Sequence, residues 1–525
     1  MARASACLAT ALFAAVALHA QDRLPLPKAP APFAGSRVLA GNGKVMDCVL
    51  DAFLSLRAKV AAAPGPAVIV LAKSGKPTPA LAARLKERLG TAAADGSVAV
   101  EVVAAGSRNW HRKPDVVQSL TTGAAVWLDC EPFAAQADAE VRALLNNVAA
   151  RGGVLGAAGE VAQMLASEPF GVAASELHLS SAKSNRAKLR ADRVHWFVPK
   201  QSALLLHTGR RACVYGRTDV DVRVVAANGW PERSAAMERI DAFGLGDVPG
   251  YGLDVMSWQR SAMERALPNY PPAKPAVPKV TRGALMLHGG GGVDEATFRR
   301  FLAKAGGKNA AIVCMPDAKS FDPGREPSSY SAGKLRDLGA RNVTVLWLGD
   351  SGNAERAGRA HELLAEATGV WIDGGRTYRF MDVVQGTRVH DLLHDVLRRD
   401  GVVGGSSAGG QLIGDMLVRG NPRSNKSIMC EGYTRGLALL TGVVVDAHFL
   451  ERDREAAFGQ LVSEHPQMLG IGLDRDTGIW VEGSVAEVLG GSAVIFYDRR
   501  TDAGSVREAR CEAGDRYDLA KGKKL

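Results

Sequence analysis

The segment GVVGGSSAGGQLIGDML, residues 401–417, has the pattern of a strand, a sharp turn and a helix. It opens with the apolar run Gly401–Val403 and closes with the helix-like run Gln411–Leu417. Between them, Gly405–Gly409 has the form G-x-S-x-G, whose small residues allow a turn sharp enough to lift a serine clear of a sheet. A helix that begins there offers backbone N–H groups, including that of Ala408, to a developing oxyanion. The segment therefore predicts a nucleophile at Ser407.

Two other interpretations of this turn are open. A glycine-rich turn can join a strand to a helix without any chemistry, and Ser406 is a second hydroxyl in the same turn. The spacing of the glycines favours Ser407 over Ser406. A fluorophosphonate probe, which labels activated serines, separates a nucleophile from a plain connection.

A serine nucleophile needs a base, and His448 is the best candidate. It follows the apolar run Val443–Val445 closely, and a strand that ends in a polar residue delivers that residue to the carboxyl end of a sheet. His390 and His394 share one helix face because they are four residues apart. No carboxylate motif accompanies this pair, which favours a surface helix face over a metal site.

The region around the turn alternates apolar runs with amphipathic stretches. Uninterrupted apolar strands separated by helices predict an α/β fold with a parallel sheet covered on both faces. Ligands of such sheets bind at the carboxyl ends of the strands, where Ser407 would lie. The predicted strands of this half are Ala284–Leu287, Ala311–Met315, Val343–Leu348, Gly369–Ile372 and Val402–Val403.

The first half of the chain repeats this pattern. Ala125–Asp129 resembles Gly369–Asp373, and Leu144-Leu145 aligns with Leu392-Leu393 at the offset that also aligns Arg151 with Arg399. The corresponding turn, GAAG at 156–159, has no serine, and Cys130-Glu131 stands where the second half has a double glycine. We therefore expect a duplicated domain whose first copy is degenerate and noncatalytic. Chance similarity of two α/β segments is the alternative.

Proline-rich segments divide the chain. A cluster at 268–278 predicts a stiff linker, because proline suits neither helix interiors nor central strands. The expected organisation is a signal peptide at 1–20, a flexible lead at 21–34, a degenerate α/β domain at 35–266, a linker at 267–280 and a catalytic domain at 281–525.

Composition and charge limit the classes of partner that this protein is expected to bind. The chain has 525 residues, 46% of them hydrophobic, and a net charge of +10. Its basic residues are mixed with acidic ones, and no basic stripe or nucleic-acid module is present, so nucleic acid is not an expected partner. Residues 1–20 are apolar and end in Ala-Leu-His-Ala, which predicts a secretory signal cleaved near Ala20 and a secreted or periplasmic protein. No stable membrane insertion is expected, and an oligomer is possible.

Four ordered segments resemble a known family. GGRTYRFMDVVQGT, GVVGGSSAGG, GLALLTGVVVDAHFLERDR and LGIGLDRDTGIWVEG, within residues 283–500, are similar to cyanophycinase and its relatives, the aspartyl dipeptidase-like serine peptidases of the S51 type. The resemblance implies a flavodoxin-like or class I glutamine amidotransferase-like domain. It also implies Ser407 as nucleophile, His448 as base and Gly374-Gly375 as the oxyanion loop.

The same resemblance suggests how a substrate carboxylate is bound. Arg452 and Arg454 match arginines thought to hold an aspartate-rich substrate, and guanidinium groups suit carboxylates. Arg376 follows the double glycine where the family has Asp-Gln or Arg-Gln, and we expect it to face the substrate too. Ala447 stands where glutamine is typical, and Arg475 replaces a glutamate of the late motif.

The orienting acid is the weakest part of the expected site. The segment 419–430 has no carboxylate, so Glu431 is the candidate, with Asp446 as its rival. The sequence thus predicts a secreted serine peptidase that uses no cofactor or metal and hydrolyses acidic, aspartate-containing or β-aspartyl peptides. The alternatives are a noncatalytic peptide- or polymer-binding protein and an α/β-hydrolase esterase. An esterase of that type would place its histidine much later, whereas His448 follows Ser407 by 41 residues.

Overall fold

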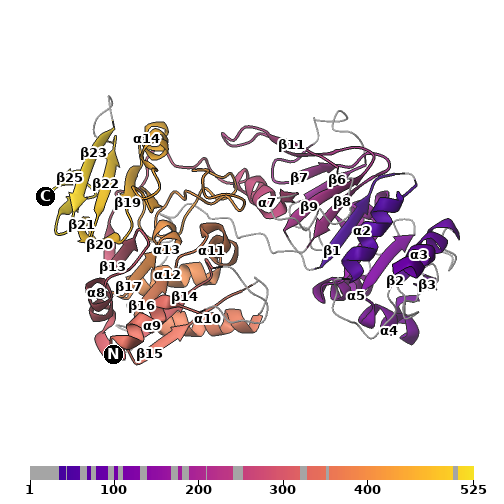
Figure 1. The fold of residues 1–525 in the computed structure, drawn as a ribbon, viewed down its shortest axis with the longest axis horizontal. Coiled ribbons are helices and arrows are strands. Elements are labelled where there is room, and N and C mark those ends of the chain that lie inside the picture. Colours follow the sequence, from indigo (N-terminus) through magenta and orange to yellow (C-terminus); the bar gives the residue numbers. More distant parts are fainter. Residues whose placement is uncertain are drawn as a thin grey trace, which may run out of the picture.

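The computed structural model describes residues 35–42, 44–58, 68–72, 79–92, 100–104, 110–129, 139–166, 175–179, 189–207, 210–239, 252–319, 328–349, 354–500 and 506–525. It contains two α/β halves, each with one large and one small sheet, and helix α7 (Val255–Glu264) lies between them (Figure 1). The predicted signal peptide and flexible lead lie outside the described residues, as does Cys130-Glu131. No helix in the described ranges has both the length and the apolar character needed to cross a membrane.

The second half is built on a nine-stranded sheet with the order β15-β14-β16-β17-β13-β20-β21-β24-β25. Its first five strands run parallel, and the sheet continues antiparallel from β20. The strands are β13 (Val280–His288), β14 (Ala311–Met315), β15 (Asn342–Val345), β16 (Gly369–Ile372), β17 (Val402–Ser406), β20 (Thr477–Gly483), β21 (Val485–Gly490), β24 (Arg516–Asp518) and β25 (Lys523–Lys524). The predicted parallel-sheet α/β fold is confirmed.

Helices cover this sheet because its central strands are apolar along their whole length. They are α8 (Glu295–Ala305), α9 (Tyr330–Asp337), α10 (Ala354–Glu366), α11 (Thr377–Val384), α12 (Arg388–Arg398) and α13 (Ala408–Leu412). A smaller sheet, β18-β19-β22-β23, packs beside it with helix α14 (Glu455–Glu464). Its strands are β18 (Val443–Ala447), β19 (Leu469–Leu473), β22 (Ala493–Asp498) and β23 (Arg507–Glu512).

The first half has a corresponding strand order, with eight strands in its large sheet instead of nine. Its large sheet runs β3-β2-β4-β5-β1-β8-β9-β12, with β1 to β5 parallel and the rest antiparallel, and its small sheet runs β6-β7-β10-β11. The strands are β1 (Ser36–Ala40), β2 (Val68–Ala72), β3 (Val100–Ala104), β4 (Ala125–Asp129), β5 (Val154–Ala158), β6 (Ser175–His178), β7 (Val194–Phe197), β8 (Ser202–His207), β9 (Arg211–Gly216), β10 (Val220–Val224), β11 (Arg233–Met237) and β12 (Leu253–Asp254). The helices are α2 (Asp47–Ala58), α3 (Pro79–Ala92), α4 (Pro114–Thr122), α5 (Ala139–Ala150) and α6 (Glu160–Leu165).

Packing details repeat as well. Trp127 on β4 meets Phe53 edge-on at 5.1 Å, and Trp371 on β16 meets Phe301 edge-on at 5.2 Å. A glycine on the neighbouring strand makes room for each indole, since a Cβ there would lie within 2.4 Å of Trp127 or 2.7 Å of Trp371. The two cores therefore use the same device at the same place in the sheet.

Helix α7 joins the halves through buried polar contacts. Glu264 accepts hydrogen bonds from Thr434 Oγ1 at 2.9 Å and from the Gly432 N–H at 3.0 Å. Arg260 donates to the Gly432 carbonyl at 2.7 Å. These partners lie in the long irregular connection between α13 and β18, which is therefore anchored on the first half. The exact domain boundary at 267–280 stays a prediction.

Candidate active site

Ser407 occupies the single residue between β17 and α13. Its backbone has φ 55° and ψ −116°, a conformation that residues other than glycine rarely adopt. The Ser407 N–H donates to the His288 carbonyl at the end of β13, 2.9 Å away, which anchors this turn on the adjacent strand. Helix α13 begins at Ala408, three residues before the predicted helix Gln411–Leu417, and ends at Leu412, so the prediction is wrong for residues 413–417.

His448 directly follows strand β18 and reaches the serine. The distance from Ser407 Oγ to His448 Nε2 is 2.9 Å, a normal hydrogen bond. His448 has φ 51°, and its N–H donates to the Gly289 carbonyl at 2.9 Å. A Cβ on Gly290 would lie 2.4 Å from His448 Nε2, so the glycine run after β13 makes room for the ring.

Glu451 lies at the other nitrogen of His448. Its Oε2 is 2.5 Å from His448 Nδ1, and its Oε1 is 3.0 Å from Arg475. The N–H groups of Leu450 and Glu451 both donate to Asp474 Oδ1 at 3.0 Å, which holds this segment against the end of β19. The geometry forms a Ser407–His448–Glu451 relay.

Sequence reasoning missed Glu451 because it searched for the acid between the serine and the histidine. His448 has a left-handed backbone and begins a turn after β18, and Glu451, three residues later in this turn, lies within hydrogen-bond distance of the ring. Arg475, which departs from the family pattern, pairs with Glu451 in the fold, but the two residues are 24 positions apart and the sequence alone does not show this pair.

Electrostatics suit His448 to the role of a neutral base. Burial lowers the pKa of His448 below its usual value, and the Glu451 hydrogen bond opposes this shift only in part. The hydrogen bond with His448 holds the pKa of Glu451 below its usual range, so that carboxyl stays ionised at neutral pH. Burial also lowers the pKa of His288, behind the serine, to about 4.

The double glycine Gly374-Gly375 lies beside the serine. A Cβ built on Gly374 would lie 3.1 Å from Ser407 Cβ, and Gly375 has φ 151° with its backbone close to the Ala318 carbonyl. The backbone hydrogen bonds found among the described residues do not use the N–H groups of Gly374, Gly375 or Ala408 as donors. The oxyanion role of these three groups stays a prediction.

Glu431 is wrong as the orienting acid. Its carboxylate contacts Arg265 and Ser261 at the end of helix α7, on the interface between the halves. The reason is tertiary: the connection after α13 runs toward the first half before it returns to β18. Asp446 is also wrong, because it is fully buried and accepts hydrogen bonds from Arg419, Arg454 and Gln411.

The three predicted substrate arginines have different surroundings. Arg454 is buried and donates to Asp446 at 2.6 Å and to the Ala447 carbonyl at 2.7 Å, so its role is to support the strand that carries His448. This corrects the prediction that it faces the substrate. Arg376 is partly buried, contacts the Asn421 carbonyl and is the N-cap residue of helix α11, directly after Gly375. Arg452 is exposed next to Glu451.

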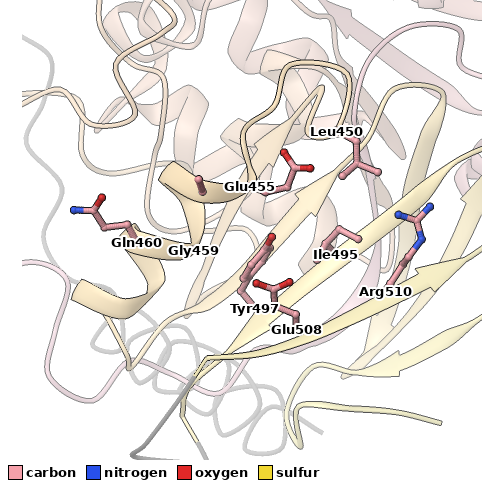
Figure 2. Close-up of a pocket in the computed structure, with 9 residues that line it drawn as sticks. Leu450, Glu455, Gly459, Gln460, Ile495, Tyr497, Glu508 and Arg510 are labelled. Atoms are coloured by element: carbon pink, nitrogen blue, oxygen red, sulfur yellow. The ribbon is translucent and has the colours of Figure 1, made fainter.

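A pocket of about 760 Å³ lies beyond the relay, between helix α14 and strands β22 and β23. Figure 2 shows Glu455 and Gln460 on the helix side, with Tyr497 and Arg510 on the strand side. Leu450, which also lines the pocket, is the residue before Glu451. Its lining does not include Ser407 or His448, so it is separate from the reacting groups.

Comparison with known proteins agrees with this geometry. The model of peptidase family S51 matches residues 285–489, which contain the whole relay. A cyanophycinase from Synechococcus elongatus is 33% identical over 233 residues, which are 41% of this chain and 68% of the relative. The chain belongs to peptidase family S51. A cyanophycinase from Trichormus variabilis is 28% identical, over 42% of this chain and 75% of its own.

Among solved structures, a peptidase from an acI-B1 Actinobacterium is 18% identical, with a TM-score of 0.34, and covers 45% of this chain and 97% of its own. As an S51 member, the protein is a serine-type peptidase, and the predicted family is confirmed. The order Ser407, His448, Glu451 along the chain also differs from the Ser–acid–His order of α/β-hydrolases. That order excludes the esterase interpretation.

Proposed function

We propose that this S51 peptidase cleaves peptides through an acyl-enzyme on Ser407. The observation that carries the proposal is the 2.9 Å hydrogen bond between Ser407 and His448, with Glu451 on the opposite ring nitrogen. His448 takes the proton of Ser407 Oγ as the oxygen attacks the scissile carbonyl carbon. The developing oxyanion is stabilised by the N–H groups of Gly374, Gly375 and Ala408.

In the next step His448 acts as an acid instead of a base. His448 gives its proton to the leaving amine as the peptide bond breaks, and the acyl group stays on Ser407 as an ester. Water then attacks the ester carbonyl carbon while His448 accepts its proton, and His448 passes this proton to Ser407 Oγ as the ester bond breaks and the carboxylic acid leaves. Glu451 keeps the imidazole in the tautomer with a proton on Nδ1, and stabilises the imidazolium that forms.

We propose an acidic substrate, with an aspartyl or β-aspartyl residue near the cleaved bond. Arg376 directly follows the oxyanion loop in the chain, and the exposed Arg452 directly follows the acid of the relay, so each of these two segments carries a cation. Two relatives are named cyanophycinase, which agrees with an aspartate-rich polymer as one candidate. We further propose export through the segment 1–20, with a mature chain that begins at Gln21.

The test is hydrolysis of cyanophycin and of β-aspartyl dipeptides, alongside neutral dipeptides as controls. We expect the acidic substrates to be cleaved and a fluorophosphonate probe to attach to Ser407, as read by mass spectrometry of the labelled peptide. Cleavage of neutral dipeptides at equal rates would contradict the substrate class and leave the mechanism intact. A label on Ser406, or no label at all, would contradict the mechanism. The amino terminus of the exported protein tests the signal peptide.

A further inference from the structure

A second group of chemically capable side chains lies in the first half, on its small sheet. Glu176 and His178 are two residues apart on β6, so their side chains lie on the same face of the sheet. The parallel register places His195 of β7 directly beside Glu176. One ligand atom from each of the three lies within 4.8 Å of the other two. No residue of this cluster contributes to the Ser407 site.

The spacing of these atoms suits a metal ion. His178 Nε2 is 3.0 Å from His195 Nδ1, which is 3.4 Å from Glu176 Oε2. Zinc bonds nitrogen and oxygen at about 2.0–2.2 Å, so tetrahedral ligands lie roughly 3.3–3.5 Å apart. Two of the three separations are close to this range, and the third, between Glu176 and His178, is within 4.8 Å, so a change in the partly exposed Glu176 side chain would admit an ion between the three groups.

The surroundings of His195 favour a ligand role. Its Nε2 is 2.8 Å from the Arg190 carbonyl, which can only accept, so Nε2 carries the proton and Nδ1 presents a lone pair toward His178. A histidine that binds a metal through one ring nitrogen usually donates the N–H of the other ring nitrogen to a carbonyl, a carboxylate or water. The side chain of His195 is fully buried, and the ring of His178 stacks on Phe197 at 4.8 Å, so both rings are fixed in place.

We propose that Glu176, His178 and His195 bind one zinc-type divalent cation, with a fourth position left for water. On binding, the proton on His178 Nε2 moves to Nδ1, and Nε2 becomes a ligand, so the neutral ring keeps one proton. Arg223 lies beside His195 on β10, but its guanidinium is 3.5 Å from Glu232, which balances its charge. The ion would tie β6 to β7 and stabilise the first half.

The test uses the full chain, without a histidine tag, after treatment with a chelator. Zinc titration against a chromophoric competitor should show one tight site, and cobalt should give the visible absorption of a four-coordinate ion. Zinc should also raise the melting temperature, since an ion that binds only the folded state stabilises it. Glu176→Gln and His178→Ala, both at partly exposed positions, should weaken zinc binding roughly 10-fold or more.

His361→Ala is the matched control, because His361 lies on helix α10 of the other half, outside the cluster. It should bind zinc as the unaltered chain does. No tight site in the unaltered chain, or equal zinc affinity in His178→Ala and Glu176→Gln to that of the unaltered chain, would overturn the proposal. The cluster would then be only a hydrogen-bonded histidine pair.

Discussion

The turns after β5 and β17 have similar backbone conformations, but only the turn after β17 carries a nucleophilic side chain. Gly159 has φ 62° and ψ −140°, and Ser407 has φ 55° and ψ −116°. Each N–H donates to the last residue of the neighbouring strand, to Ala40 at 3.0 Å or to His288 at 2.9 Å. The first half keeps this turn with Gly159, because glycine adopts such a backbone conformation without strain. The second half has Ser407 there, so its backbone is strained and its hydroxyl is placed at the end of the sheet.

The comparison shows that fold and function depend on different residues. Arg151 donates to the Leu120 and Gly123 carbonyls, and Arg399 donates to those of Leu364 and Ala367 in the same way. These contacts maintain the helix ends in both halves. We propose on this basis that residues 35–266 are a duplicated, noncatalytic copy of the peptidase domain.

Ser407→Ala should have the largest effect. Without its nucleophile, a serine peptidase retains only about a 10³–10⁴-fold acceleration over water, so peptide turnover and probe labelling should vanish. The partner variant Gly159→Ser places a hydroxyl on the equivalent elbow without the relay, and it should gain no probe label at that elbow. A label at position 159 of this variant would show that the first half still holds an active site, and would break the comparison.

Glu451→Gln should follow in size. The amide cannot stabilise the imidazolium, so kcat should fall about 10²–10⁴-fold, within the range of general acid–base catalysis. Glu431→Gln is the matched control, because it makes the same change at the domain interface. It should lower the melting temperature and leave kcat near its normal value. Equal loss of kcat in both variants would contradict the assignment of Glu451 as the orienting acid.

Gly156→Ala and Gly404→Ala sharpen the structural side of the comparison. Each new methyl would meet an indole, on Trp127 or on Trp371. Overpacking of this kind typically costs about 1–3 kcal/mol. Denaturant unfolding should show losses of similar size for the two variants. A loss confined to one of them would mean that the two cores are packed differently.

The pH profile should show the smallest effect. His448 acts as a base only when neutral, so kcat/KM rises with pH as the ring loses its proton. Because burial lowers the pKa of His448, the acid limb should lie below about pH 6.5, the usual imidazole value. The Glu451 hydrogen bond raises this pKa, so the residual activity of Glu451→Gln should have its acid limb at still lower pH. An acid limb above pH 6.5 in the unaltered protein would contradict this.

The sequence by itself determined the features that depend on short stretches of chain. The apolar run before Gly405–Gly409 and the helix after it are local, so the elbow and Ser407 could be predicted from residues 401–417. The position of His448 at the end of an apolar strand is equally local. The parallel-sheet fold followed from the same alternation of apolar runs and amphipathic stretches.

Only the tertiary structure decided which carboxylate meets His448 and which arginine is buried. Glu431 is held by Arg265, 166 residues earlier in the chain, and Glu451 by Arg475 from beyond β19. Arg454 lies so close to Asp446 that the buried carboxylate, and not a substrate, takes its charge. Local sequence cannot show such pairs, because the direction of a charged side chain depends on which distant segment brings the opposite charge within reach.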